Sequence, residues 1–389
     1  MKLAEVQEAL REQRIDAWLF CDHHRRDPLA YRVLGLEPGR EVTRRWFYLI
    51  PSEGEPRGLV HKIEATVLDS LPGEKTAYAS WGSLTDGLMR LLHGCNRVAM
   101  QYSPRCAVPY VAMVDAGTVE MVRSFGVEIV SSADLIQHFE ARWNEEKLSS
   151  HLESGRKVDR IRREAFVLAS ESLRGGSQIT EWDLAEFIRG RFAAEGLTTD
   201  HGPIVAVDEN AANPHYEPAC EGSLRIETGC VLLIDMWAKL RRPQSVYYDI
   251  TWAGYCGKVA PASVQRVFEV VKEARNRAIE RVQRAVSSGE PLCGYQVDDA
   301  ARGYIQEEGF GDYFVHRTGH SIGEEVHGAG ANMDNLETHD ERRIIPWTCF
   351  SIEPGIYLRE FGIRSEVNVF CGDGEARVTG EMQEELIFV

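Results

Sequence analysis

Four carboxylates occur in two similarly spaced pairs in the C-terminal half of the chain. Asp235 ends an apolar, strand-like run, and Asp249 follows it by 14 residues in a second strand-like segment. Glu353 ends another such run, and Glu366 follows it by 13 residues. Because side chains alternate between the faces of a strand, each pair can share one face of a β-hairpin. Four carboxylates gathered together repel one another unless cations bind them, so the pattern predicts a metal site.

Three histidines lie between the two carboxylate pairs. His316, His320 and His327 fall within twelve residues, although the whole chain has only 12 histidines. Glycines around them allow close backbone approach, and neutral imidazole is a good metal ligand. A single buried histidine is usually a structural group. Together with the carboxylate pairs, these histidines favour the metal interpretation.

Two other catalytic patterns compete with this interpretation. Residues 319–323 match the G-x-S-x-G nucleophile elbow around Ser321, but that motif requires a following acid and then a histidine, and only His327 and His339 follow. A zinc-protease helix is not expected either, because the chain has no HExxH motif. The cluster at 22–24 (Asp-His-His) is interpreted as a polar loop.

The ordered set of candidate ligands resembles that of a known family. Asp235, Asp249, His320, Glu353 and Glu366 follow the ligand order of the pita-bread metallopeptidases (M24), which include aminopeptidase P, prolidase and methionine aminopeptidase. Further motifs are similar, namely 213–216 (Asn-Pro-His-Tyr), 316–327, 353–357 (Glu-Pro-Gly-Ile-Tyr) and Arg364, two residues before Glu366. The resemblance covers about residues 147–389.

The resemblance implies a pair of divalent metal ions. Asp249 and Glu366 would bridge the ions, Asp235 would complete one of them, and His320 with Glu353 would complete the other. Such oxygen-rich ligands suit Mn²⁺, the ion expected first, and also Co²⁺, Zn²⁺ or Fe²⁺. Two ions of this kind can activate a water molecule as the nucleophile.

The resemblance also implies roles for residues around the ions. Glu353 would transfer the proton, and His215 and His327 would stabilise the oxyanion. His316 would line the substrate pocket. Arg364 would hold a ligating carboxylate. At the pocket mouth we expect contributions from four further side chains, Trp237, Arg241, Arg242 and Trp252.

The expected activity is hydrolysis of an N-terminal Xaa–Pro bond in a small peptide, as in aminopeptidase P or prolidase. The resemblance further suggests a homodimer. Alternatives are a two-metal hydrolase of another small amide or ester, a creatinase-like amidine hydrolase, and a non-catalytic partner-binding protein on the same fold. Two departures from the family bear on the pocket: the Asp235–Asp249 spacing is about three residues longer than expected, and Trp252 replaces a more usual arginine.

The elements that must position these residues fall into two predicted domains. Residues 1–143 alternate strand-like runs with helices at 84–92 and 110–125, which predicts an α/β domain similar to the N-terminal, RNase H-like domain of creatinase. Such a domain disfavours methionine aminopeptidase. Residues 144–389 are predicted to form the α+β pita-bread domain. Its expected helices are a long one ending near residue 173, one capped by Thr180 and ended by Gly196, and one from Pro261 to Gly289.

Composition limits the remaining possibilities. The 389 residues are 43% hydrophobic, enough to bury a core, and the net charge of −16 argues against a nucleic-acid partner bound by a general basic surface. No run of about 18 apolar residues predicts a membrane helix, so no membrane partner is expected. Residues 1–20 read as an amphipathic helix without the apolar region of a signal peptide, and the nine cysteines form no CxxC pair. These features predict a cytoplasmic protein with reduced thiols.

Overall fold

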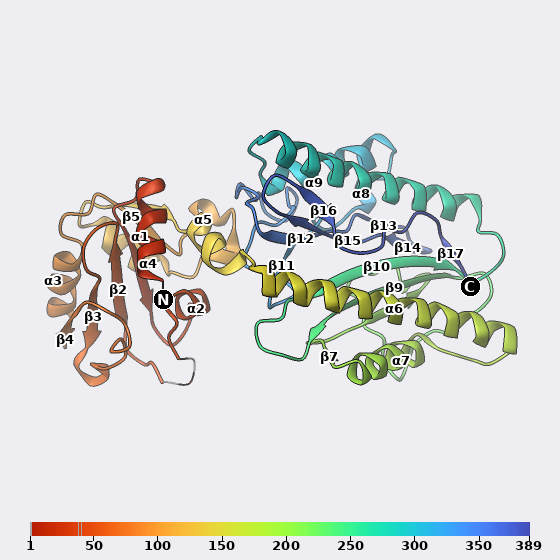
Figure 1. The fold of residues 1–389 in the computed structure, drawn as a ribbon, viewed down its shortest axis with the longest axis horizontal. Helices are drawn as coiled ribbons and strands as arrows, with labels where there is room; N and C mark the ends of the chain where they lie inside the picture. The colour runs from red at the N-terminus through yellow and green to blue at the C-terminus, as the bar shows by residue number, and fades with distance from the viewer. Residues whose placement is uncertain (1, 38, 40) are drawn as a thin grey trace. The chain divides into compact units, whose positions relative to one another are not determined.

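The computed structural model describes residues 2–37, 39 and 41–389. The chain divides into two compact units, Met1–Glu140 and Ala141–Val389 (Figure 1). The assignment of domains to 1–143 and 144–389 stays a prediction. Each unit is an α and β structure with its own sheets and its own core.

The N-terminal unit is built on one mixed sheet. Its described strands follow the order β4-β3-β2-β1-β5-β6, with β1 antiparallel to β2 and parallel to β5. Helices α3 and α4 pack on one face through apolar side chains such as Leu88 and Val122. The elements are α1 (Leu3–Glu12), β1 (Ala17–Asp22), α2 (Pro28–Leu34), β2 (Trp46–Pro51), β3 (Arg57–His61), β4 (Glu74–Tyr78), α3 (Trp81–Leu91), β5 (Arg97–Met100), α4 (Ala116–Arg123), β6 (Glu128–Ser131) and α5 (Ala133–Ile136).

The predicted helix at 110–125 is too long at its N-terminal end. Asp115 caps α4, since its Oδ1 accepts a hydrogen bond from Thr118 N at 2.9 Å. The backbone N–H groups of Met113 and Val114 instead bind Gln101 O. An N-cap residue has non-helical geometry, so the helix begins only at Ala116.

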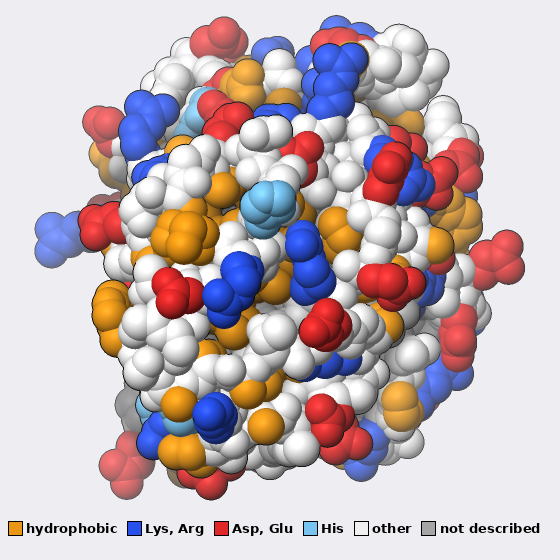
Figure 2. All heavy atoms as spheres, turned by 90° about the vertical axis from the view of Figure 1, so that its left-hand side faces the viewer, with side chains coloured by type: hydrophobic (Ala, Val, Ile, Leu, Met, Phe, Trp, Pro, Cys, Tyr) orange, Lys and Arg blue, Asp and Glu red, His pale blue; other side chains and the backbone are white. Residues whose placement is uncertain are grey.

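One face of the molecule is mixed in charge. Figure 2 shows a face on which acidic and basic side chains are interspersed with apolar ones, and the described side chains of this face form no continuous basic patch. Such mixing is typical of a solvated surface. No helix among the described residues is both long enough and apolar enough to cross a membrane.

The helices of the C-terminal unit end where their capping residues predict. Helix α6 (Glu145–Gly175) ends at Gly176, and α8 (Ala262–Ser288) ends at Gly289, both in the left-handed conformation that glycine adopts without strain. Helix α7 (Glu181–Ala194) begins with the predicted capping box of Thr180 and Asp183. The fourth long helix is α9 (Gly294–Glu307). The predictions for the first three helices are confirmed.

The strands of this unit form two principal sheets between pairs of helices. One sheet has the order β17-β10-β9-β7, with β8 also pairing β9, and the other has the order β11-β12-β15-β16. Helices α6 and α7 share a core with β9 and β10, while α8 and α9 share one with β12 and β15 (Figure 1). The strands are β7 (Leu197–Thr198), β8 (Ile204–Val207), β9 (Val231–Leu240), β10 (Tyr248–Tyr255), β11 (Ser321–Ile322), β12 (Thr348–Ile352), β13 (Gly355–Tyr357), β14 (Gly362–Arg364), β15 (Val367–Cys371), β16 (Ala376–Val378) and β17 (Ile387–Phe388).

The sequence around Glu366, residues 362–367, predicts one short strand, but the structure divides this segment between two strands. Strand β14 pairs with β13, whereas β15 pairs with β12. Between them, Ser365 N donates to Pro354 O at 3.3 Å and Glu366 N donates to Thr251 O at 3.1 Å. Glu366 therefore lies in the break between two strands, where its backbone contacts β10. Sequence alternation alone does not reveal this change of partner.

Candidate metal centre

The β9–β10 hairpin presents two carboxylates on one face. Asp235 pairs with Thr251, and Asp249 pairs with Trp237, so the two acids lie diagonally across the hairpin on the same side. The alternate residues, including Ile234 and Ile250, pack into the core with α6 and α7. This arrangement confirms the predicted hairpin and gives it one polar and one apolar face.

The second carboxylate pair is placed by the neighbouring sheet. Ile352, at the end of β12, pairs with Val367, at the start of β15. Glu353 and Glu366 are the next residues beyond that pair, so they lie beside each other at the same edge. The two sheets are joined there, because the Asn368 side chain hydrogen-bonds the backbone N and O of Asp249 at 3.2 and 2.7 Å.

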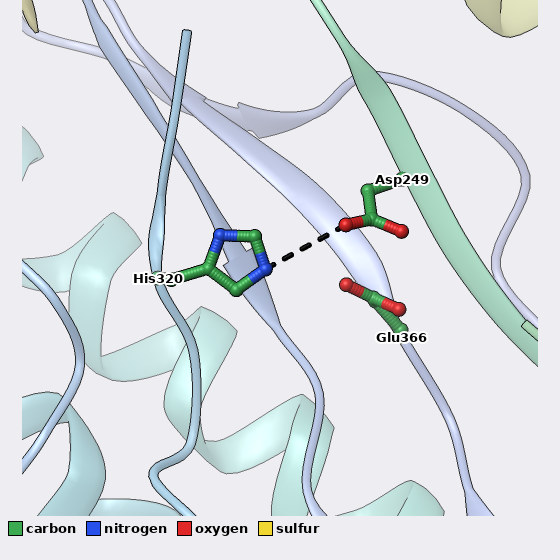
Figure 3. A group of neighbouring side chains, drawn as sticks. All are labelled: Asp249, His320 and Glu366. Carbon is green, nitrogen blue, oxygen red and sulfur yellow. Dashed lines mark ion pairs between the residues drawn. The ribbon is translucent and has the colours of Figure 1, made fainter. Parts of the chain in front are cut away.

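His320 completes the cluster from the segment just before β11. Ligand atoms of Asp249, His320 and Glu366 all lie within 4.8 Å of one another, and the three side chains point toward a common space (Figure 3). His320 Nε2 lies 3.6 Å from Asp249 Oδ2 and 3.4 Å from Glu353 Oε1. All three residues of the cluster are buried.

The tautomer of His320 follows from its backbone contact. Ser321 O, a carbonyl that can only accept, lies 3.1 Å from Nδ1, so Nδ1 carries the proton and Nε2 carries a lone pair. Burial lowers the pKa of His320 and favours this neutral form. The lone pair of His320 Nε2 faces two carboxylates, which repel it unless a cation lies between them. A nitrogen lone pair and carboxylates directed at one point are the arrangement of ligands in a metal site.

Three buried carboxylate oxygens of this cluster have no hydrogen-bond partner within the described structure: Asp235 Oδ1, Asp249 Oδ1 and Glu366 Oε1. Leaving such atoms without a partner is costly. Burial, followed by the nearby Asp235 charge, raises the pKa of Asp249 well above its usual range. Burial and the Asp249 charge do the same for Glu366. A hard divalent cation would satisfy these oxygens, so the donor set fits the metal ions that the sequence predicts.

Arg364 orients carboxylates of the cluster through hydrogen bonds. Its guanidinium donates to Asp235 Oδ2 at 2.6 Å, to Thr251 Oγ1 at 3.0 Å and to the Tyr357 hydroxyl at 2.8 Å. The Thr251 hydroxyl in turn donates to Glu366 Oε2 at 2.8 Å. One buried arginine thus orients two of the four carboxylates. The contributions of Thr251 and Tyr357 were missed in the sequence, although Thr251 shares a strand face with Asp249.

His316 joins the same network. Its Nδ1 lies 2.7 Å from Arg317 O, so that nitrogen carries the proton, and Nε2 accepts a hydrogen bond from the Tyr357 hydroxyl at 2.7 Å. Burial and the Arg364 charge lower the pKa of His316 to about 3, so the ring is neutral. Its polar atoms are therefore directed to Tyr357 and Arg317.

His327 and His215 lie at the exposed side of the cluster. The rings of His320 and His327 meet edge to face, with centroids 4.4 Å apart. The nearby His320 lowers the pKa of His327 to about 3, and His215 also contributes to this shift. His215 belongs to the loop between β8 and β9 and is exposed, with its backbone N donating to Asn213 Oδ1.

Some sequence-based expectations about the surroundings are wrong. Trp252 does not face the carboxylates: it lies on the opposite face of β10, with the Arg162 guanidinium carbon 3.4 Å from its ring centroid. Arg241 extends toward β7, donating to Leu197 O at 3.4 Å. Trp237 does share the face of Asp235 and Asp249, and its indole N–H donates to Asp200 Oδ1 at 2.8 Å.

The competing motifs have structural roles. Ser321 of the G-x-S-x-G pattern is buried in β11, and its hydroxyl accepts a hydrogen bond from Gly330 N at 3.0 Å. No helix follows it, so the nucleophile elbow is absent from this described segment. Asp22 of the Asp-His-His cluster accepts hydrogen bonds from the backbone of residues 25–27 and from the Tyr31 hydroxyl, as expected of a polar loop.

Comparison with known proteins identifies the family. The model of metallopeptidase family M24 matches residues 153–373, which contain every proposed ligand and all three accessory histidines. The chain belongs to the M24 metallopeptidases. The M24 assignment agrees with the resemblance seen in the sequence and with the fold described above.

Named M24 relatives include peptidases that act on proline-containing substrates. The chain is 30% identical over 239 residues to a putative Xaa-Pro aminopeptidase of Mycoplasma pneumoniae, covering 59% of this chain and 60% of that protein. It is 30% identical over 244 residues to an Xaa-Pro dipeptidase of Pyrococcus furiosus, covering 62% and 64%. The matches thus span less than two thirds of these relatives.

A solved structure shares the whole fold. The dipeptidase PepE of Mycobacterium ulcerans superposes with a TM-score of 0.70 at 21% identity, covering 100% of this chain and 96% of that one. At this identity the likeness establishes the fold, including the N-terminal unit preceding the pita-bread unit. The predicted fold class is confirmed.

Proposed function

We propose that this chain is a two-metal exopeptidase that hydrolyses an N-terminal Xaa–Pro bond. The observation that carries the proposal is the set of three buried carboxylate oxygens without partners, faced by the lone pair of His320 Nε2. A pair of divalent ions would neutralise the four acids and would satisfy the unpaired oxygens.

The proposed ligands are Asp235, Asp249, His320, Glu353 and Glu366. Ligand atoms of Asp249, His320 and Glu366 lie within 4.8 Å of one another, so these three residues would hold the ions together with Asp235 and Glu353. Mn²⁺ is the proposed ion. When bound, the ions would supply Lewis-acid polarisation of the scissile carbonyl and activation of water.

The chain's own side chains would then handle protons and developing charge. Glu353 is the least buried of the four acids, with 16% of its side chain exposed, and the Ser351 hydroxyl fixes its Oε1 from 3.1 Å. It is the proposed proton carrier between nucleophile and leaving group. His327 and His215, at the exposed side of the cluster, are the proposed hydrogen-bonding partners of the carbonyl oxygen as it gains negative charge.

His316 and Arg364 are proposed to position the ligands. The contacts run from His316 through the Tyr357 hydroxyl to Arg364 and on to Asp235. Because His316 is neutral and accepts from Tyr357, the hydroxyl oxygen keeps a lone pair for the Arg364 guanidinium. The Asp235 carboxylate is thereby fixed by one oxygen and offers the other.

The Xaa–Pro preference is supported by the names of the M24 relatives, which include an Xaa-Pro aminopeptidase and an Xaa-Pro dipeptidase. Proline makes the preceding amide tertiary and fixes φ, so such bonds require a dedicated site. Whether the enzyme takes dipeptides or longer chains is proposed to depend on the loops that shape the substrate site, beside which Trp237 shares the strand face of Asp235 and Asp249.

The test is hydrolysis of Ala-Pro and Ala-Pro-Ala with Mn²⁺ by the wild type and by Glu353→Ala. We expect the variant to lose at least about a hundredfold in kcat, because a positioned acid–base group contributes about 10²–10⁴. Glu280→Ala, at an exposed position of α8, is the matched control and keeps full activity. Equal turnover by Glu353→Ala and wild type would overturn the proposal. The ratio of the two substrate rates separates dipeptidase from aminopeptidase.

A further inference from the structure

Two cysteines face each other at the open end of the β9–β10 hairpin. Cys230 directly precedes β9 and Cys256 directly follows β10, one position beyond the paired residues Val231 and Tyr255. Their backbones are joined, since Cys256 N donates to Cys230 O at 2.9 Å. They are therefore a cross-strand pair whose side chains leave the sheet on the same face.

The two thiols contact each other. Both side chains belong to the same buried cluster beside α6 and α7, and a hydrogen bond joins them. Both cysteines are free. That hydrogen bond lowers the pKa of the Cys230 thiol and raises that of Cys256, so Cys230 is the better nucleophile of the two.

A second pair of cysteines on neighbouring strands does not face each other. Pairing of two strands is therefore not enough by itself to bring two cysteine side chains onto the same face. Cys349 pairs with Phe370, whereas Cys371 pairs with Thr348. The side chains of Cys349 and Cys371 therefore leave opposite faces of the sheet and lie in different cores. They cannot join without rearranging the strands.

The Cys230–Cys256 pair is buried but lies next to exposed residues at the end of the hairpin. Cys230 follows three exposed turn residues, 227–229, and Cys256 precedes the exposed Lys258 and Val259. Gly229 adopts φ +105°, a conformation that side chains rarely take, and its N–H donates to Cys256 O at 2.6 Å. The pair thus lies directly beneath the surface turn at one end of the hairpin.

We propose that Cys230 and Cys256 are a redox modification site that peroxide oxidises to a cross-strand disulfide. The Cys230 thiolate attacks one peroxide oxygen and becomes a sulfenic acid as water leaves. The Cys256 sulfur then attacks the sulfenic sulfur, forms the S–S bond and releases a second water. The two thiols lose two electrons and two protons in total, and one hydrogen peroxide is reduced to two waters. A dithiol reductant reverses the reaction.

The disulfide would close a loop that contains both Asp235 and Asp249. Closing this loop restricts the unfolded chain and so stabilises the folded hairpin. We expect oxidation to raise Tm by about 5 °C in a chain of this size. The inference does not depend on the proposed peptidase activity.

The test uses the full chain with Cys106→Ser and Cys220→Ser, which removes two exposed thiols. After hydrogen peroxide treatment, one part of the sample gives a melting curve, and the other is alkylated in denaturant for intact mass measurement and non-reducing peptide mapping. We expect two fewer alkylated thiols than in the untreated chain, a peptide linking Cys230 to Cys256, and a raised Tm that dithiothreitol reverses. Adding Cys95→Ser, at a half-buried position in the N-terminal unit, leaves all of these results unchanged.

Adding Cys256→Ser, or Cys256→Ala if the serine variant does not fold, should abolish the link and the rise in Tm. Two observations would overturn the inference. One is that both thiols remain open to alkylation after peroxide treatment. The other is that Cys230 gains about 16 or 32 Da as sulfenic or sulfinic acid without forming a link in the chain that retains Cys256.

Discussion

Arg364 Nη2 lies 2.6 Å from Asp235 Oδ2, and both side chains are buried. Asp235 comes from β9 and Arg364 from the end of β14, so the ion pair joins two parts of the fold that are far apart in sequence. The remaining oxygen of Asp235 has no hydrogen-bond partner in the described structure. The arginine thus holds the carboxylate by one oxygen and leaves the other available to a cation.

Replacing Arg364 tests this relationship. Arg364→Met should lower the free energy of unfolding by about 3–5 kcal/mol in chelator, because it leaves a buried carboxylate without its partner. Arg359→Met, at an exposed position between β13 and β14, is the control and should change it by less than about 0.5 kcal/mol. Urea unfolding measures both variants. Similar unfolding free energies for Arg364→Met and Arg359→Met would show that the ion pair between Arg364 and Asp235 does not stabilise the site.

Removing metal should destabilise the wild type more than a variant with fewer buried charges. Glu366→Gln keeps an oxygen that accepts from Thr251 but removes one charge from the cluster. Mn²⁺ should therefore raise the Tm of the wild type by several degrees over the chelated protein, while Glu366→Gln shows a much smaller rise. Glu360→Gln, an exposed neighbour, should respond as the wild type does. A rise in Glu366→Gln as large as in the wild type would argue against its role as a ligand.

His327 should matter for catalysis and not for folding. Its side chain is exposed and contacts the ring of His320, so His327→Ala costs little packing. If it stabilises the oxyanion, kcat on Ala-Pro should fall by about 10²–10³ while Tm and bound metal are unchanged. His93→Ala, at an exposed position of the N-terminal unit, serves as the control. A fall in kcat of less than about threefold would remove His327 from the mechanism.

His151 should make the protein sensitive to acid. This buried ring is held as a neutral group between Tyr247 O at 2.6 Å and Thr379 Oγ1 at 2.7 Å. Burial lowers its pKa to about 4, against an ordinary value of 6.5. Between these values the unfolded chain binds a proton that the folded chain does not, so stability falls as the pH drops from 6.5 toward 4.

His151→Gln removes this effect while keeping one donor and one acceptor. Whatever the packing cost, the stability advantage of the wild type over the variant should be about 2 kcal/mol smaller at pH 5 than at pH 7.5. His93→Gln controls for the loss of an exposed histidine. Urea unfolding at the two pH values measures the difference, and an advantage that does not change with pH would contradict the assignment.

The hairpin that carries Asp235 and Asp249 could be predicted from the sequence because its formation depends on residues that are close together in the chain. Asp235 and Asp249 share a face as a direct consequence of strand alternation, and an apolar strand ending in an acid is visible without any knowledge of its neighbours. The ends of three helices in the C-terminal unit were equally predictable, because Thr180, Gly176 and Gly289 act on the turn next to them.

Features that depend on distant pairing were not predictable. Glu366 lies in a strand break because its backbone binds Thr251, which is more than a hundred residues earlier. The links from Arg364 to Thr251 and Tyr357 require three elements to meet. Trp252 was assigned to the pocket, although strand alternation places its side chain on the other face of β10 from Asp249. There it packs against Arg162. Strand β6 and helix α2 were missed because each is short.

The most direct test of the central claim is a titration of Mn²⁺ into metal-free protein. Bound metal and the initial rates on Ala-Pro and Ala-Ala are measured on the same samples. Hydrolysis of Ala-Pro should rise with bound metal and reach its maximum at two ions per chain, with Ala-Ala cleaved at least about tenfold more slowly. Full activity without metal, or no hydrolysis of Ala-Pro with two ions bound, would contradict the assignment of this site as a two-metal Xaa-Pro peptidase.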